Sequence, residues 1–247
     1  TIIIDEKSRE IRLKEIIKEL DRQCQVVGVG IAGGHTTVCP NVNSPVVSVT
    51  AIGHKLRTHQ KAVAGQDIVM TKHIGMSGIR TVISHKRDEI LNVLPEDVIN
   101  KAFAADEELI IAKEAQIFIK QNIDGAMHDA SEGGIFAALW DMAEYSGTGL
   151  DIDLRHISVK QEIIEICELF NINPYILDSM GCLLMTCENG CDIVNIMKQN
   201  GIEDFVIHAP YIINIGKITD GNNRIIHNTE EDRYLGLPEQ DEIYRFI

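Results

Sequence analysis

The segment MHDASEGG, residues 127–134, combines two carboxylates, a hydroxyl group and two successive glycines. Asp129 could cap the helix predicted to follow it, with Glu132 returning the hydrogen bond as in a capping box, so a structural role accounts for both carboxylates. It does not account for Gly133 and Gly134, because glycine costs about 1 kcal/mol relative to alanine inside a helix. Bare backbone at the positive end of a helix suits an anion such as a phosphate group. The segment therefore predicts an anion site.

Two shorter segments also contain glycines next to polar side chains. The first is GGHT, residues 33–36, which follows a predicted strand. Its glycines let the backbone approach a ligand closely, and its histidine and threonine could bind a metal ion or phosphate oxygens. A tight turn capped by His35 is the structural alternative. The second segment, GMSG, contains Gly75 and Ser77 before a predicted helix and has the general form of an anion site.

Three cysteines, Cys182, Cys187 and Cys191, are close enough in sequence to suggest a site for a soft metal. The simpler interpretation is that Cys182 and Cys187 lie in an apolar strand and pack as small hydrophobic residues. The six cysteines of the chain form no CxxC pair. This usage predicts a reducing, cytoplasmic environment.

The charge of the chain narrows the classes of partner. With 23 basic and 37 acidic residues the formal net charge is -14, which does not favour a nucleic acid partner. No run approaches the roughly 20 apolar residues that cross a bilayer, so no membrane partner is expected. A nucleotide bound together with a metal ion suits an acidic chain, because carboxylates hold the cation. The P-loop, Rossmann, serine hydrolase and zincin motifs are absent from the sequence.

The elements that must position these residues follow from the spacing of apolar side chains. Helices are predicted over residues 8–22, 77–84, 95–104, 109–120, 134–145, 160–170 and 191–199. Strands are predicted over residues 2–4, 26–31, 46–52, 67–71, 126–128, 150–154, 183–187, 205–208 and 212–218. Helices and strands mix without strict alternation, which predicts an α+β fold with sheets covered by helices. A boundary near residues 64–65 predicts two domains, 1–65 and 66–247.

Taken together, the sequence resembles the AIR synthase-related (PurM-like) superfamily, and most closely its HypE-like branch. The segments that carry the resemblance occur in the same order along nearly the whole chain: GGHT at 33–36, PVVSVTAIG at 45–53, MHDASEGG at 127–134, AEYSGTG at 143–149 and GKI at 216–218. The resemblance implies a strand-rich N-terminal domain that pairs across a two-fold axis into a homodimer. It also implies a C-terminal α+β domain with a mixed sheet covered by helices.

The same resemblance implies ATP between the domains, Mg²⁺ held by carboxylates, and activation of an oxygen by phosphate transfer. The expected catalytic residues are Asp129 and Glu132. The expected metal ligands are Asp129 and, less securely, His35. The expected nucleotide or phosphate contacts are Gly33, Gly34, Thr36, Gly75, Ser77, Ser131, Gly133 and Gly134. Replacing Gly133 by alanine should then keep or raise thermal stability but weaken nucleotide binding at least tenfold, about 1.4 kcal/mol.

The sequence departs from the family pattern in three ways. About the first quarter of a typical member has no counterpart here. His35 stands where members carry Asp or Glu, and imidazole is a poorer Mg²⁺ ligand than a carboxylate. HypE proteins end in a cysteine that carries the carbamoyl and cyano group, whereas no cysteine follows Cys191. HypE chemistry in that strict form is therefore not expected of this chain.

Two functional hypotheses follow. The first is an ATP-dependent phosphate-transfer enzyme that acts on an unknown small-molecule or protein substrate, with a link to hydrogenase maturation. The second is a non-catalytic dimeric protein that binds nucleotide or assists assembly on the same fold. The predicted strands 26–31 and 46–52 have exposed edges, which predict a homodimer with two-fold symmetry.

Overall fold

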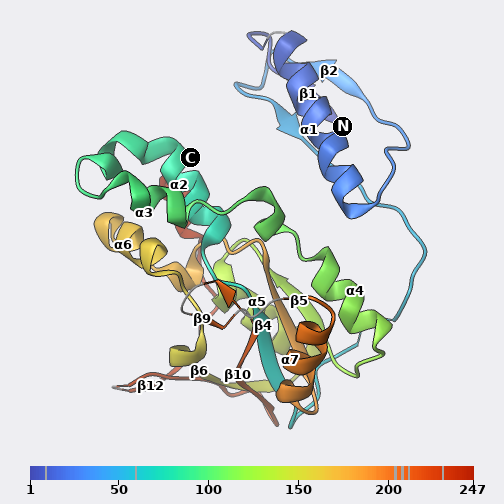
Figure 1. The fold of residues 1–247 in the computed structure, drawn as a ribbon, viewed down its shortest axis with the longest axis vertical. Helices are drawn as coiled ribbons and strands as arrows, with labels where there is room; N and C mark the ends of the chain where they lie inside the picture. The colour runs from blue at the N-terminus through green and yellow to red at the C-terminus, as the bar shows by residue number, and fades with distance from the viewer. Residues whose placement is uncertain (9, 59, 203–204, 207–208, 211, 230) are drawn as a thin grey trace. The chain divides into compact units, whose positions relative to one another are not determined.

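The computed structural model describes residues 1–247 except 9, 59, 203–204, 207–208, 211 and 230 (Figure 1). The described residues form two compact units, Thr1–Leu56 and Arg57–Ile247. Both contain strands and helices, and the α+β class predicted from the sequence is confirmed. None of the helices in the described part of the chain is both long and apolar enough to cross a bilayer.

The first unit is a three-stranded sheet with one long helix. Its elements are β1 (Ile2–Ile4), α1 (Glu10–Val27), β2 (Thr36–Val38) and β3 (Val46–Val47). In the sheet β1 lies in the middle, parallel to β2 and antiparallel to β3. Asp5 lies between β1 and α1, where its carboxylate accepts hydrogen bonds from the Ser8 hydroxyl and from two backbone N–H groups. The Ser8 hydrogen bond above all holds the pKa of Asp5 below its usual value.

The predicted strand over residues 26–31 is wrong. The helix α1 continues through Val27, and Gly28 then adopts a left-handed conformation with φ of 72°. The N–H of Val29 donates to the carbonyl of Cys24 at 2.8 Å, so the chain ends the helix with a glycine turn. The valines that suggested a strand therefore prolong a helix. Consequently the segment 33–36 follows an irregular stretch, not a buried strand.

The predicted strand over residues 46–52 is mostly absent as well. Only Val46–Val47 pairs with β1, and the following residues 48–52 have no strand pairing. Val49 is 71% exposed and Ile52 is 96% exposed, so nothing within the described chain covers this apolar run.

The second unit is built on a seven-stranded mixed sheet. Its strands, in spatial order, are β12 (Asp232–Tyr234), β11 (Arg224–His227), β6 (Gly149–Asp153), β10 (Ile212–Thr219), β4 (Asp67–Thr71), β7 (Cys182–Cys187) and β5 (Met127–Ala130). The β11–β6 pair is parallel and the other five pairs are antiparallel. A separate two-stranded ladder joins β8 (Phe205–Val206) to β9 (Ala209–Pro210). The predicted strand 205–208 thus lies partly outside the described residues.

The helices of the second unit match the predicted ones in type and approximate position. They are α2 (Met76–Leu91), α3 (Glu96–Ala102), α4 (Ala112–Lys120), α5 (Gly134–Ser146), α6 (Gln161–Phe170) and α7 (Gly190–Gln199). Four short 3₁₀ helices accompany them: η1 (Asp106–Leu109), η2 (Leu154–His156), η3 (Pro174–Ile176) and η4 (Glu242–Arg245). Pro95 precedes the first turn of α3 as its N-cap residue.

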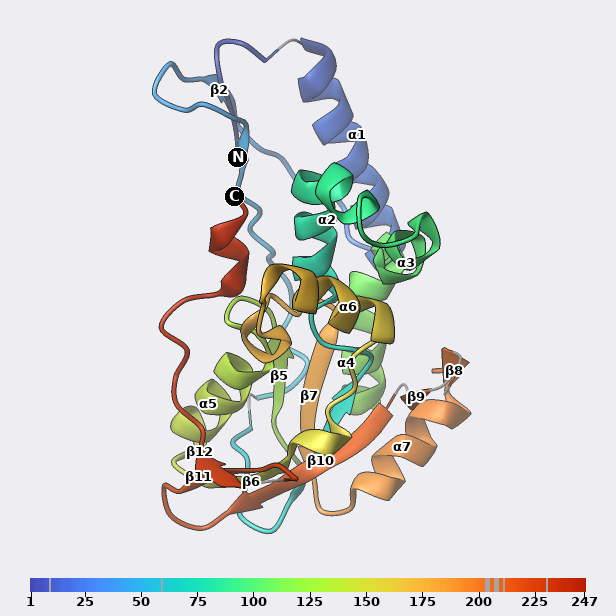
Figure 2. The same ribbon diagram turned by 90° about the vertical axis from the view of Figure 1, so that its left-hand side faces the viewer.

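Both faces of the large sheet are covered (Figure 2). Cys182 and Leu184 of β7 belong to the apolar cluster that includes α5, whereas Leu183, Met185 and Cys187 belong to the cluster that includes α4 and α7. The side chains of β7 alternate between these two cores, and all six residues are buried. Burial on both faces explains why the strand is an uninterrupted apolar run in the sequence. A third cluster joins α2, α3, α6 and η4.

Candidate functional site

Asp129 lies near the end of strand β5 and does not cap a helix. The helix α5 begins at Gly134, and its N-cap residue is Gly133, which has a φ of 77°. The Asp129 carboxylate is exposed and accepts a hydrogen bond from the Ser131 hydroxyl at 3.1 Å. The capping-box interpretation is therefore wrong, because β5 continues to Ala130 and the helix starts later than the sequence suggested. The carboxylate is left available for chemistry.

A carboxylate of the chain itself lies at the N-terminus of α5. The N–H of Gly133 donates to Oδ2 of Asp241 at 2.7 Å. The other oxygen of Asp241 accepts from the N–H groups of Asp178 at 3.1 Å and Ile243 at 2.8 Å. The sequence predicted an anion contact at this glycine but missed Asp241, which is 108 positions away. The only local signal was that Asp241 caps η4, and it did not point to Gly133.

Backbone packing supplies a further reason for the two glycines. Gly134 has a φ of 65°, and a Cβ there would lie 2.6 Å from the carbonyl oxygen of Tyr175 and 2.8 Å from that of Leu177. A Cβ on Gly133 would lie 2.6 Å from the Cβ of Ala137. Alanine would therefore be strained and crowded at both positions. The expectation that Gly133→Ala keeps or raises stability is reversed by this geometry.

Glu132 is held by the C-terminal 3₁₀ helix η4. The hydroxyl of Tyr244 donates to Oε1 of Glu132 at 2.5 Å. This hydrogen bond, together with the negative charge of Glu132, raises the pKa of the Tyr244 phenol. Asp178 lies in the same acidic neighbourhood, and burial above all raises the pKa of its carboxyl. The two predicted catalytic carboxylates thus have different surroundings: Asp129 meets one hydroxyl, and Glu132 meets a tyrosine.

Gly75 and Ser77 contact the loop at residues 178–179. The same loop also contacts the segment that leads into the turn at Gly133 and Gly134 (the glycine turn). The N–H of Gly75 donates to the buried hydroxyl of Ser179 at 2.9 Å, and the hydroxyl of Ser77 donates to the carbonyl of Asp178 at 3.0 Å. The N–H of Ser179 in turn donates to the carbonyl of Ser131 at 3.2 Å. The structure therefore brings Gly75, Ser77 and Ser131 together around residues 178–179. Their polar groups hold this loop between the N-termini of α2 and α5.

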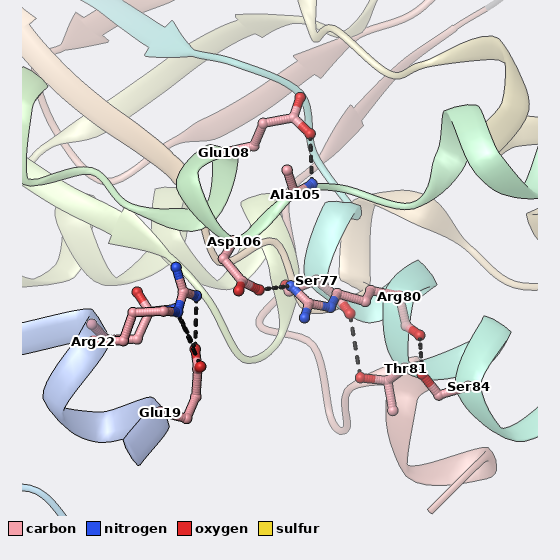
Figure 3. A network of polar contacts seen from close by, with 10 residues as sticks. Glu19, Arg22, Ser77, Arg80, Thr81, Ser84, Ala105, Asp106 and Glu108 are labelled. Carbon is pink, nitrogen blue, oxygen red and sulfur yellow. Dashed lines mark hydrogen bonds and ion pairs between the residues drawn. The ribbon is translucent and has the colours of Figure 1, made fainter. Parts of the chain in front are cut away.

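The second turn of α2 is held by contacts with η1 and with the residues just before η1. Figure 3 shows Arg80 of α2 reaching Asp106, with Nη1 and Oδ1 2.6 Å apart. The Arg80 guanidinium also lies over the ring of Phe103, 4.9 Å from its centre. Farther along η1, the Glu108 carboxylate accepts a hydrogen bond from the N–H of Ala105 at 2.9 Å. These contacts make the N-terminus of α2 a rigid support for the loop.

The remaining predicted site residues lie in the first unit. Residues 33–36 are exposed, and a Cβ on Gly33 or Gly34 would have no heavy atom within 4 Å. The carbonyl of His35 accepts a hydrogen bond from the N–H of Ile2 at 2.8 Å, which ties the segment to β1. Thr36 is the first residue of β2. Open space around the glycines is what an approaching ligand would need, although no conformational constraint requires glycine there.

A cavity of about 730 Å³ lies around the edge of β5. Of the predicted site residues, Asp129 lines it. Its other lining residues come from α4, α5, β5, β7 and their connections: Ile111, Ala115, Ala126, Met127, His128, Asp141, Met142, Glu144, Tyr145, Ser146 and Leu183. Among the described residues, three carboxylates and no lysine or arginine line the cavity. It is therefore suited to a cationic ligand, or to an anionic one that is accompanied by a metal ion.

The cysteine cluster does not form a metal site. Cys182 and Cys187 project from opposite faces of β7 into different cores, and Cys191 is exposed at the start of α7. Burial raises the pKa of both Cys182 and Cys187 to about 12. More generally, no group of three or more His, Cys, Asp or Glu side chains in the described part of the chain could hold a metal ion. The packing interpretation of these cysteines agrees with the structure.

The chain matches two family models. The C-terminal domain of AIR synthase related proteins matches residues 63–227, and the N-terminal domain of the same proteins matches residues 1–54. A Methanocaldococcus jannaschii protein named for hydrogenase expression and formation is 26% identical over 193 residues, which is 75% of this chain and 54% of that protein. A carbamoyl dehydratase HypE from Rhodobacter capsulatus is 23% identical over 189 residues, which is 74% of this chain and 53% of that protein.

A solved structure of hydrogenase maturation protein HypE in complex with ATP superposes with a TM-score of 0.73. The superposition covers 98% of this chain and 73% of that chain, at 16% identity. At this identity the match establishes a shared fold. The chain spans about half the length of the two curated relatives named above.

Proposed function

The chain belongs to the AIR synthase-related family, and from this premise we propose that it contributes to an ATP-dependent enzyme. The proposed reaction transfers phosphate from ATP to an oxygen of the substrate and so activates that oxygen. Relatives named for hydrogenase formation and for carbamoyl dehydration favour a substrate in hydrogenase maturation. A relative of the same fold that was solved with ATP favours this nucleotide.

The proposal rests on the position and exposure of Asp129. Asp129 is exposed and lines the cavity, and its carboxylate is not used to cap a helix. A carboxylate that has no structural task and faces a cavity is a candidate for ligand or metal binding. Ser131 donates a hydrogen bond to one of its oxygens and so orients it.

The residues present fit Mg²⁺ only if the nucleotide also supplies ligands. Mg²⁺ is commonly bound through one or two carboxylates together with substrate phosphates. Asp129 would supply that carboxylate in the second unit. When bound, the ion would neutralise charge on the phosphates. The acidic lining of the cavity favours a nucleotide that arrives with its metal ion over a free anion.

The other predicted residues of the second unit would act around this carboxylate. The Tyr244 hydroxyl donates a hydrogen bond to Glu132. This pair would receive or return a proton near the reacting oxygen. Gly75, Ser77, Ser131, Gly133 and Gly134 would keep the two helix N-termini and the loop between them in place. Within the first unit, Gly33, Gly34 and Thr36 are proposed as nucleotide contacts because the space around the two glycines is open.

Calorimetric titration with a non-hydrolysable ATP analogue and Mg²⁺ tests the proposal on the full-length protein. We expect Asp129→Asn to fold normally and to lose Mg²⁺-dependent binding at least tenfold, about 1.4 kcal/mol. Asp141→Asn, which changes another exposed carboxylate of the same cavity, is the matched control and should bind like the parent. Equal binding by Asp129→Asn and the parent would remove Asp129 from the site. Absence of binding at millimolar nucleotide would exclude the enzyme.

One observation favours the second function, a non-catalytic dimeric protein that binds nucleotide or assists assembly. The N–H of Gly133 is already paired with Asp241, and Glu132 is already paired with Tyr244. An ATP turnover assay separates the two functions. Turnover that is lost on Asp129→Ala would establish the enzyme, whereas nucleotide binding without turnover would establish the assembly protein. A cytoplasmic location is proposed from the six unpaired cysteines.

A further inference from the structure

Strand β5 ends the large sheet, and its outer edge is unpaired among the described strands. The N–H of Thr186 donates to the carbonyl of Ala126, so Ala126 turns its backbone groups toward β7. Residues of an antiparallel strand alternate in this respect. Met127 and Asp129 therefore turn their N–H and C=O groups outward, away from the sheet. One of these groups, the Asp129 carbonyl, is 2.6 Å from Nδ1 of His128.

The two sides of this edge differ in chemistry. On the α4 side, Ile111, Ala115 and Met127 offer an apolar surface beside the exposed side chain of Asp129, which shares the face of β5 with Met127. On the α5 side, Asp141, Glu144, Tyr145 and Ser146 offer polar groups. A strand added to this edge would send its side chains alternately to the two sides. Such a strand would fit best if apolar residues alternated with polar ones.

The carboxylates on the α5 side indicate which polar residues a bound segment should carry. Asp141 is exposed and has no hydrogen-bond or ion-pair partner within the described part of the chain. Glu144 is also exposed and lies 2.5 Å from Arg224, so its charge is partly balanced. The cavity lining contains no lysine or arginine from the part of the chain that the structure describes. A basic side chain on the α5 side would therefore meet an uncompensated carboxylate at Asp141.

The cavity is formed before any partner arrives. Its α4 wall is fixed by Glu114, whose carboxylate lies 2.9 Å from Nζ of Lys72, with both side chains almost fully buried. The opposite wall belongs to α5, whose residues Leu139, Met142 and Ala143 are packed in the core of the sheet. A volume of about 730 Å³ is within the range of protein ligand sites. Binding would need little rearrangement of either wall.

We propose that the outer edge of β5 binds an extended segment of a partner protein as an added strand, with apolar residues alternating with lysine or arginine. Main-chain hydrogen bonds to Met127 and Asp129 would supply affinity, and the two sides of the edge would supply specificity. Such docking does not require the proposed nucleotide chemistry. It would bring the partner segment beside Asp129, where a protein substrate would have to lie.

The test uses fluorescence anisotropy with the full-length protein and labelled peptides. The probe is the peptide VKVKVK, and its controls are VEVEVE and a VKVKVK peptide that is N-methylated at alternate residues. We expect saturable binding of VKVKVK that weakens as salt is added, and at least tenfold weaker binding of both controls. N-methylation removes the N–H groups from one edge of the peptide and leaves the protein unchanged. Equal binding of the N-methylated peptide would overturn the proposal.

Two proline variants test the edge from the side of the protein. Met127→Pro removes an outward N–H and should weaken VKVKVK binding at least tenfold. The matched control is Tyr234→Pro on β12, the opposite end strand, where pairing of the Leu235 N–H with Arg224 places the Tyr234 N–H outward. This control should bind like the parent. If Tyr234→Pro weakened binding as much as Met127→Pro, the effect would not be local and the proposal would fail.

A charge variant completes the test. Asp141→Asn should weaken the binding of VKVKVK several-fold and leave the binding of a VSVSVS peptide unchanged, because the serine peptide has no charge to lose. The same loss for both peptides would contradict the assigned role of Asp141. Sedimentation of the unliganded protein tests the other occupant, a second copy of this chain. A dimer that Met127→Pro dissociates would overturn the proposal in favour of self-pairing.

Discussion

At the scale of single residues, Asp241 connects three separate segments of the candidate site. One carboxylate accepts three backbone N–H groups, which come from the glycine turn, the loop at Asp178 and the 3₁₀ helix η4. Hydrogen bonds to a charged group contribute roughly 1.5–3 kcal/mol each where the group is buried. The turn beside Asp129 is therefore held in shape by the chain itself, with or without a bound phosphate.

The glycine turn gives a direct prediction at this scale. Gly133→Ala should lower the free energy of unfolding by about 1–2 kcal/mol, because alanine is strained at a φ of 77° and its Cβ would meet Ala137. Gly147→Ala is the control, since Gly147 has a φ of 72° but open space around its Cβ position. Thermal unfolding of both variants separates backbone strain from the steric clash. A more stable Gly133→Ala variant would show that the turn relaxes.

Reactivity of the cysteines provides a second prediction. Cys191 is exposed, whereas burial raises the pKa of Cys167, Cys182 and Cys187 to about 12. Thiolates are the reactive form, so the three buried thiols should resist alkylation in the folded protein. Mass spectrometry after brief treatment with iodoacetamide should find Cys191 modified first. Labelling of Cys182 at the rate of Cys191 would contradict the two-sided burial of β7.

At the scale of elements, a histidine joins three strands near the β12 end of the large sheet. Nδ1 of His227 lies 2.7 Å from a carboxylate oxygen of Asp232, and its Nε2 lies 3.0 Å from one of Asp151. Both ring nitrogens face an acceptor, so the imidazole can donate to both only when it is protonated. The hydrogen bond to Asp232, followed by that to Asp151, raises the pKa of His227 above its usual value. We therefore expect the stability of this part of the sheet to vary with pH.

The sign of this dependence follows from the raised pKa. The charged histidine contributes its full stabilisation below the ordinary pKa of about 6.5, and the contribution is lost as pH rises through the higher folded value. The melting temperature of the parent should therefore fall more between about pH 6 and about pH 9 than that of His227→Gln. His54→Gln, an exposed histidine of the first unit, serves as the control. If the melting temperatures of His227→Gln and the parent changed with pH in parallel, the contacts of His227 with Asp151 and Asp232 would contribute nothing to stability.

At the scale of the whole molecule, the exposed strand edges of the first unit predict how the protein assembles. Its three-stranded sheet ends in β2 and β3, whose outer edges are unpaired among the described strands, and all their residues are exposed. We expect the full-length protein to be a homodimer by light scattering at micromolar concentration. Val47→Lys should weaken the dimer, because charge on an edge strand opposes pairing. Val49→Lys, outside the strand, should not. A monomeric parent would refute the expectation.

Much of the second unit could be predicted from local patterns. Strands such as Asp67–Thr71 and Cys182–Cys187 are β-branched or apolar runs whose burial on two faces leaves a strong signal. The helix Gly134–Ser146 has an apolar face and a terminal glycine. The first unit was harder, because Val26 and Val27 fit a helix or a strand equally well by composition. Gly28 decided between them by ending the helix.

The candidate site was harder to predict for a different reason. Asp129 and Gly133 were predicted as site residues because their residue types and spacing are unusual within eight positions. The residues that contact this segment lie far away in sequence: Asp241 binds Gly133, Tyr244 binds Glu132 and Ser179 binds Ser131. Nothing local in those distant segments indicates the contacts. A pattern within one segment can show that a carboxylate or glycine is out of place. It cannot show which distant residue completes the arrangement.

The position of β4 in the sheet has a consequence for synthesis of the chain on the ribosome. It pairs on one side with β7 and on the other with β10, and Gly190 binds Asp67 across 123 positions. The apolar β4 strand must therefore leave the exit tunnel long before either neighbour exists. Contacts between residues so far apart in sequence slow folding, and the edges of β4 stay unpaired until its neighbours have been made. The nascent chain should consequently need protection by a holding chaperone until β10 has emerged.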